Sequence, residues 1–134
     1  MSDSSSAMKN RSMNAAIALK QDYREFLHKA ATLFPKIDQK LLMSMLYYEN
    51  TYSDWEGNVL LEVVYPAGID MDRKKEWIFQ RFQRMGSIEE NKTVRFKVIR
   101  MYLEDIDELL REDPQIEFIT GSATLTPSES YTSP

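Results

Sequence analysis

The 134-residue sequence predicts an α+β fold in which two N-terminal helices pack on a small sheet of three or four strands. Apolar residues recur every three or four positions over residues 13–34, which is the period of an amphipathic helix. Over residues 59–65 and 93–99 the side chains instead alternate between two faces, as they do in strands. The predicted order after the two helices is β-α-β-α-β, and the alternative is a small three-layer α/β sandwich.

The first predicted helix carries its apolar side chains on one stripe. The stripe residues, spaced alternately by three and four positions, are Ala16, Leu19, Tyr23, Phe26, Ala30 and Leu33. Pro35 ends this helix because proline donates no backbone hydrogen bond and restricts the residue before it. A second helix follows the N-cap residue Asp38 and continues to about Glu49. The short connection favours antiparallel packing of the two helices against each other. The apolar stripe of the first helix packs either within the chain or against a second copy in a coiled-coil dimer.

The middle of the chain predicts a strand, a helix and another strand. Both faces of the first strand are largely apolar, which favours a central position in the sheet. Asp70 or Asp72 caps the helix, which continues to about Met85 and ends at Gly86. This order within about 40 residues predicts a crossover between parallel strands, whereas an extra hairpin strand in residues 86–92 would make the sheet mixed.

The C-terminal part predicts one helix and one or two short strands. Residues 103–112 carry apolar side chains on one side and acids on the other, which is typical of a short amphipathic helix. Residues 116–119 follow as a strand, and Gly121-Ser122 predicts a turn into a returning strand.

The composition restricts both the domain organisation and the chemistry. Polar tails at residues 1–12 and 122–134 are expected to be disordered, which leaves one globular domain at residues 13–121. The chain has no cysteine and one histidine, His28, on the polar side of the first helix, so no thiolate or histidine-based site is expected. With no cofactor motif and no long apolar segment, we expect a cytoplasmic protein that binds no cofactor, metal or membrane.

Charge is sorted along the sequence. Residues 73–100 contain 9 basic and 3 acidic side chains, whereas residues 101–134 contain 1 basic and 8 acidic ones. On the helix within the basic segment, the basic side chains form an arc around Trp77. Arg95 and Lys97 on the next strand extend this arc if their face is exposed on the same side. The acidic helix is either a solvated face or a partner that neutralises the basic helix within the fold.

We expect two surfaces to bind a partner. The first is the basic arc with its aromatic centre, whose alternative interpretation is a solvated helix face. The second is the aromatic segment 47–55, whose alternative interpretation is a lid over the end of the core. The residues predicted to contact a partner are Tyr52, Trp55, Arg73, Lys74, Trp77, Arg81, Arg84, Arg95 and Lys97.

These features favour a non-enzymatic protein-interaction module, such as a regulator, adaptor or assembly factor. Sorted charge orients and accelerates encounter with a charged partner, and Tyr and Trp are preferred at protein interfaces. The alternative is a nucleic-acid-binding regulator that uses the helix at 71–85 and the strand at 93–99. The formal net charge of −4 argues against this alternative. An enzyme with a carboxylate-only site is the third hypothesis.

Overall fold

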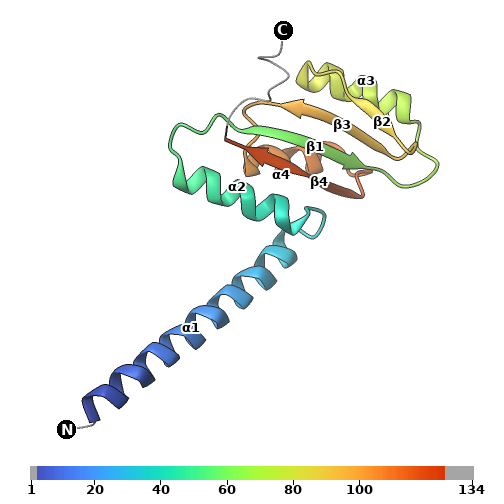
Figure 1. Cartoon of the computed structure of the whole chain (residues 1–134). Helices are drawn as coiled ribbons and strands as arrows, with labels where there is room; N and C mark the ends of the chain where they lie inside the picture. The colour runs from blue at the N-terminus through green and yellow to red at the C-terminus, as the bar shows by residue number, and fades with distance from the viewer. Residues whose placement is uncertain (1–2, 126–134) are drawn as a thin grey trace. The chain divides into compact units, whose positions relative to one another are not determined.

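The structure, a computed structural model, describes the backbone of residues 3–125 and the side chains of residues 14–125. Within these residues it contains four helices and a four-stranded sheet, which confirms the predicted α+β class. The elements are α1 (Asp3–Leu33), α2 (Gln39–Thr51), β1 (Asn58–Val64), α3 (Met71–Phe82), β2 (Ser87–Glu89), β3 (Thr93–Val98), α4 (Leu103–Glu112) and β4 (Phe118–Thr124) (Figure 1).

The chain divides into two compact units with a boundary between Pro35 and Lys36. The described part of the first unit is the single helix α1, which begins at Asp3 rather than near residue 13. The second unit, here called the body, contains every other described element. The packing of α1 on the sheet or on α2 stays a prediction. The prediction of disordered tails is wrong for residues 3–12, which belong to α1, and for residues 122–124, which belong to β4, while residues 1–2 and 126–134 lie outside the described residues.

The sheet has the strand order β2-β3-β1-β4, and every neighbouring pair is antiparallel. β1 lies between β3 and β4, as its two apolar faces predict. The predicted parallel crossover between β1 and β3 is wrong, because the short strand β2 reverses the chain before β3 begins. The alternative of a hairpin strand within residues 86–92 is confirmed, in a sheet that is antiparallel rather than mixed.

Alternation along the strands gives the sheet one buried face and one open face. The buried face pairs three residues of β1 with three of β3: Val59 with Val98, Leu61 with Phe96, and Val63 with Val94. All six are buried. The opposite face, here called the open face, carries their half-exposed or exposed neighbours Leu60, Glu62, Val64, Arg95 and Lys97. Arg95 and Lys97 therefore share one solvent-facing side of their strand, as predicted.

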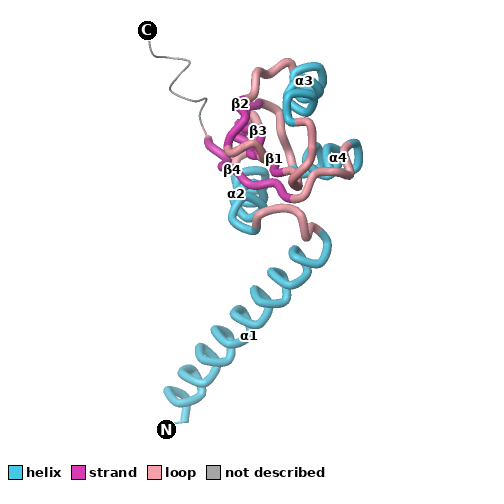
Figure 2. Tube along the Cα trace, turned by 90° about the vertical axis from the view of Figure 1, so that its right-hand side faces the viewer, coloured by secondary structure: helices cyan, strands magenta, loops and turns pink. Residues whose placement is uncertain are grey.

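All three helices of the body contribute buried side chains to the core. α3 packs on β2 and β3, while α2 packs on β4 and α4. Figure 2 shows α3 and α4 on the same side of the strands. The segment before α2 is fixed to β4, where Ile119 N donates to Lys36 O (2.7 Å) and Asp38 N donates to Ile119 O (2.8 Å). Within the body the sheet is covered on one face, so the architecture is not a three-layer sandwich.

Both predicted aspartate caps are present. Asp38 accepts a hydrogen bond from Leu41 N (3.3 Å) at the start of α2. Asp70, rather than Asp72, caps α3 and accepts a hydrogen bond from Arg73 N (3.2 Å). Each cap satisfies a backbone N–H group that has no partner within the first helical turn.

The end of α3 differs from the prediction. The helix ends at Phe82, and Gln83 takes the left-handed conformation with φ of 60°. Gly86 is therefore not the glycine that ends the helix. It is buried against β3, and an added Cβ would lie 2.6 Å from Val94 Cγ1. Gly86 is needed for the close approach of this loop to the sheet.

Gly121 lies in the middle of β4, and the predicted turn and returning strand at this position are wrong. The register places Gly121 opposite Leu61, so the strand passes straight through it. The φ of Gly121 is +145°, and an added Cβ would overlap the carbonyl oxygen of Leu60. Glycine is required here because two strands approach closely, not because the chain turns.

Gly121→Ala is expected to lower the free energy of unfolding by about 3 kcal/mol or more, because backbone strain combines with an overlap that separates β4 from β1. Gly68→Ala is the matched control: its φ of +91° is also positive, but an added Cβ would meet nothing within 4 Å. The control should lose only about 1 kcal/mol from strain. Urea unfolding followed by tryptophan fluorescence measures both, and equal losses would contradict the close approach.

Candidate functional site

The acidic helix α4 neutralises part of the basic helix α3. Arg81 forms two hydrogen bonds to the carboxylate of Glu112, from Nε to Oε2 (2.8 Å) and from Nη2 to Oε1 (3.1 Å). The Glu108 carboxylate lies 3.9 Å from the Arg81 guanidinium. The hydrogen bond from Arg81 lowers the pKa of Glu112, and the same bond raises the pKa of Arg81. The interpretation that the two helices neutralise each other within the fold is confirmed for this pair.

A buried cluster forms around Asp113, the residue that follows α4. Lys74 Nζ lies 3.0 Å from Asp113 Oδ1 and 3.1 Å from Oδ2, and the Tyr65 hydroxyl donates to Oδ2 (2.8 Å). The Gln115 amide donates to Oδ1 (3.2 Å), and the Lys74 ammonium lies 5.1 Å from the centre of the Tyr65 ring. Burial, together with the Asp113 carboxylate, raises the pKa of Tyr65. Because these four groups satisfy one another, we interpret the cluster as structural.

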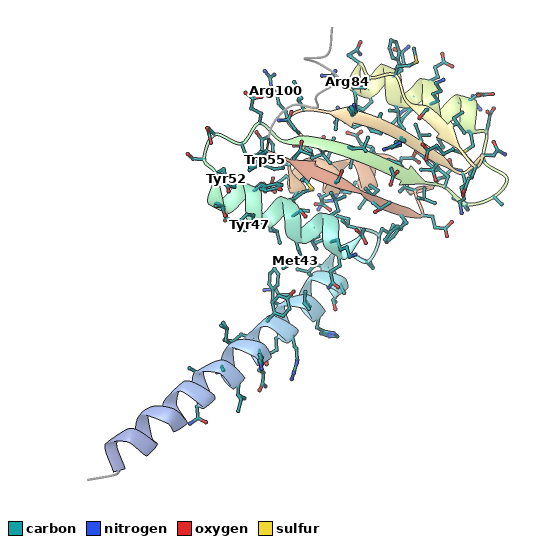
Figure 3. All side chains as sticks on the ribbon, in the orientation of Figure 1. Met43, Tyr47, Tyr52, Trp55, Arg84 and Arg100 are labelled. Atoms are coloured by element: carbon teal, nitrogen blue, oxygen red, sulfur yellow. The ribbon has the colours of Figure 1, made fainter. Side chains whose placement is uncertain are left out.

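A groove of about 480 Å³ lies at one end of the open face, and we call it the open-face groove. Its lining residues are Leu60, Arg84, Met85, Ser87, Arg95, Phe96 and Lys97. Arg84 and Met85 come from the loop after α3, and Figure 3 shows Arg84 beside β3. Leu60 lies directly opposite Lys97 in the register, so β1 and β3 form the floor of the groove.

The open-face groove combines positive charge with apolar surface. Arg95 lies 3.5 Å from both Glu62 and Glu89, so its charge is partly neutralised. Arg84 forms no ion pair with another described residue. The Met85 side chain is 71% exposed at the rim, so it adds accessible apolar surface to the groove.

A second cleft, of about 440 Å³, lies at the start of α3. It brings together Arg73, Lys74 and the half-buried Trp77 from the predicted arc. The Lys74 charge is already balanced by Asp113, and Asp70 adds a carboxylate to the lining. This cleft therefore has less positive charge available to bind an anion than the open-face groove has.

The aromatic segment closes the end of the core. Trp55 is buried, and its indole Nε1 donates to Thr124 O (2.7 Å). Its ring lies 5.5 Å from Tyr48 and 5.7 Å from Tyr102, and the Tyr102 hydroxyl donates to Trp55 O (3.0 Å). These contacts fit the lid interpretation and make the Trp55 side chain inaccessible to a partner.

The outer tyrosines remain at the surface. Tyr52 is half-buried, and Tyr47 is exposed, with ring centres 6.1 Å apart. A hydrogen bond with Tyr47 raises the pKa of Tyr52. Figure 3 shows both residues at the end of α2 near Trp55. Tyr48 is half-buried as well, so the three tyrosines, and not Trp55, are the aromatic side chains of this segment that a partner can reach.

The structure divides the predicted site residues into separate groups. Arg84, Arg95 and Lys97 meet in the open-face groove, whereas Arg73, Lys74 and Trp77 line the second cleft. Arg81 belongs to neither set and is held by α4, while Tyr52 and Trp55 belong to the lid. The basic side chains of the predicted arc therefore lie in three different places: the second cleft, the contact with α4 and the open-face groove.

Sequence reasoning missed the apolar part of the groove and the role of Asp113. Leu60 is on the second face of a strand that was expected to be buried on both faces, so nothing in its pattern marks it as surface. Asp113 stands among the acids of a solvated helix, and its position before Pro114 signals only a helix end. Its burial follows from the path of α3, which the sequence does not show.

Residues 14–125 contain neither a group of metal-ligating side chains nor a helix that could cross a membrane. No cluster of three or more histidine or carboxylate side chains there is arranged to hold a metal ion. None of the described helices combines the length and the apolar character needed to cross a membrane.

Comparison with known proteins leaves function open, because no protein-family model, curated protein or solved structure matches the chain. Inference about function therefore rests on the geometry of the described residues.

Lys74→Met is expected to lower the free energy of unfolding by about 3–5 kcal/mol, because Asp113 keeps a buried charge without a cation. Lys75→Met is the control, since Lys75 forms no ion pair with another described residue, and it should cost about 0.5 kcal/mol or less. Adding Asp113→Leu to Lys74→Met should recover part of the loss, because no buried charge remains. Urea unfolding tests all three, and equal effects of the two lysine substitutions would refute a buried pair.

Glu112→Gln is expected to lower the free energy of unfolding by about 1 kcal/mol or less at neutral pH, since the pair with Arg81 is partly exposed. The folded-state pKa of Glu112 lies below its usual 4.5, so its stabilising contribution is complete above that value. The contribution disappears as the pH falls through the lowered pKa. The free energies of unfolding of the variant and the parent should therefore become equal in acid. Urea unfolding at several pH values measures both, with Glu104→Gln as the control. A difference that persists in strong acid would contradict the ion-pair origin.

Proposed function

We propose that the body is a protein-interaction module without catalytic activity, and that the open-face groove binds a partner segment carrying acidic and apolar side chains. The observation that supports this most directly is the composition of the groove. Three basic residues, Arg84, Arg95 and Lys97, line it together with Leu60 and Met85. No helix of the body covers this face of the sheet.

The chemistry of the groove defines the partner. Carboxylates on the partner would approach Arg84 and Lys97, and the guanidinium of Arg84 offers two parallel hydrogen bonds to a carboxylate. An apolar side chain next to those carboxylates would cover Leu60 and the exposed Met85. The partner would thus be a short acidic and apolar segment rather than a purely charged surface.

A protein fits this surface better than a nucleic acid, which is the alternative. Sheets that bind RNA stack two or three bases on exposed aromatic side chains. Among the described residues, the open face carries one aromatic side chain, the half-buried Phe118. Lys74, Arg81 and Arg95 are engaged by carboxylates of the same chain, which reduces the charge available to phosphates.

Two further expectations belong to the same proposal. We propose a cytoplasmic location, because a small interaction module of this composition needs no membrane and no disulfide. A homodimer is the second proposed partner, and it would use a different surface, the helix α1.

A random peptide library displayed on phage tests the groove. Peptides selected by the full chain are expected to combine Asp or Glu with Leu, Ile, Met or Phe. Charge reversal by Arg84→Glu with Lys97→Glu should weaken the selected peptides by about a hundredfold in fluorescence anisotropy, which corresponds to two lost charged contacts. The control, Arg73→Glu with Lys75→Glu, makes the same change in net charge outside the groove and should retain binding.

The result that would overturn the proposal is equal binding to the groove variant and the control variant, or selected peptides without acidic residues. A labelled single-stranded RNA and a DNA duplex form the second arm of the experiment. Nucleic acid that binds the parent chain, is lost in the groove variant and weakens steeply with salt would favour the alternative.

A further inference from the structure

The helix α1 exposes an apolar stripe that its own unit cannot bury. The large stripe residues Leu19, Tyr23, Phe26 and Leu33 are 41–71% exposed, while Ala30 is buried. Single helices in water gain most of their stability when an apolar face packs on something else. The described part of this unit is one helix and has no core of its own.

We infer that α1 pairs with α1 of a second copy of the chain, in antiparallel orientation. The six stripe residues occupy the a and d positions of two and a half heptads, which is the narrow seam of a coiled coil. In an antiparallel pair each a position faces a d position. The seam then forms layers in which Ala16 faces Leu33 and Tyr23 faces Phe26, each occurring twice by two-fold symmetry, while Leu19 lies beside the helical turn that holds the buried Ala30.

The sizes of the side chains select this orientation. In the antiparallel register a small residue faces a large one at both ends, and two aromatic rings meet in the centre. A parallel pair would place each residue opposite its own copy. Ala16 would then face Ala16 and Ala30 would face Ala30, which leaves gaps beside crowded Tyr23 and Phe26 layers.

The charges beside the seam select the same orientation. Asp22 and Lys29 both occupy g positions, and g positions face each other in an antiparallel pair. The register that aligns the layers brings Asp22 of one copy beside Lys29 of the other, twice in the dimer. In a parallel pair g faces e, and Asp22 would face the apolar Leu27 instead. Neither Asp22 nor Lys29 forms an ion pair with another described residue.

Sedimentation of the full chain over a concentration series tests this inference, which does not depend on the function of the groove. A dimer with a dissociation constant on the order of micromolar is expected for so short a seam. Asp22→Lys alone and Lys29→Asp alone should each weaken the dimer about tenfold, because like charges then face each other twice. The double variant should restore the parent value, which a folding defect would not do.

Single cysteines fix the orientation, since the chain has none. Ala16→Cys mixed with Leu33→Cys should give a disulfide between the two variants under mild oxidation, whereas Ala16→Cys alone should not dimerise, because two copies of residue 16 would lie roughly 25 Å apart. A disulfide between two copies of Ala16→Cys would overturn the orientation. A chain that stays monomeric throughout the series would overturn the inference, and it would mean that the stripe packs within the chain or on another protein.

Discussion

The carboxylate of Asp113 is the constraint on which the arrangement of the body depends. It receives a hydrogen bond from Tyr65 at the end of β1, an ion pair from Lys74 on α3, and a backbone amide from Gln115 on the way to β4. A single buried charge thus connects the central strand, one covering helix and the entry of an outer strand. Because a buried carboxylate is stable only with its partners in place, these three elements must be positioned together.

Much of this fold is encoded locally, and the sequence predicts it. The alternation of Val94, Phe96 and Val98 with Arg95 and Lys97 defines the two faces of β3, and Asp38 and Asp70 begin their helices as caps. Strand direction is not encoded in this way. The three residues of β2 are too few to show a period, yet they decide whether β3 runs parallel or antiparallel to β1. Gly121 shows the same limit, because its need for glycine arises from a strand that is distant in sequence.

The candidate site was predictable in its residue types but not in its grouping. Arg73, Lys74, Arg81 and Arg84 lie on one helical arc, and their spacing alone makes them equivalent. Their differences come from partners elsewhere in the chain: Asp113 holds Lys74, Glu112 holds Arg81, and the helix ends before Arg84. An apolar neighbour such as Leu60 joins the site through the pairing of two strands, which is a property of the assembled sheet.

The two edges of the sheet have a consequence for how this protein can associate with others. β2 is only three residues long, and a strand of that length offers too few backbone groups for another chain to extend the sheet there. On the other side, Ile119 of β4 uses both its amide and its carbonyl to bind residues 36 and 38, and the Thr124 carbonyl accepts from Trp55. Growth of the sheet by strand addition, which is the route to fibrous aggregates, is thereby hindered along β2 and β4, whereas residues 96–98 of β3 extend beyond β2 and pair with no described strand on that side. The body thus protects part of each sheet edge against edge-to-edge polymerisation, while none of its own helices covers the open face.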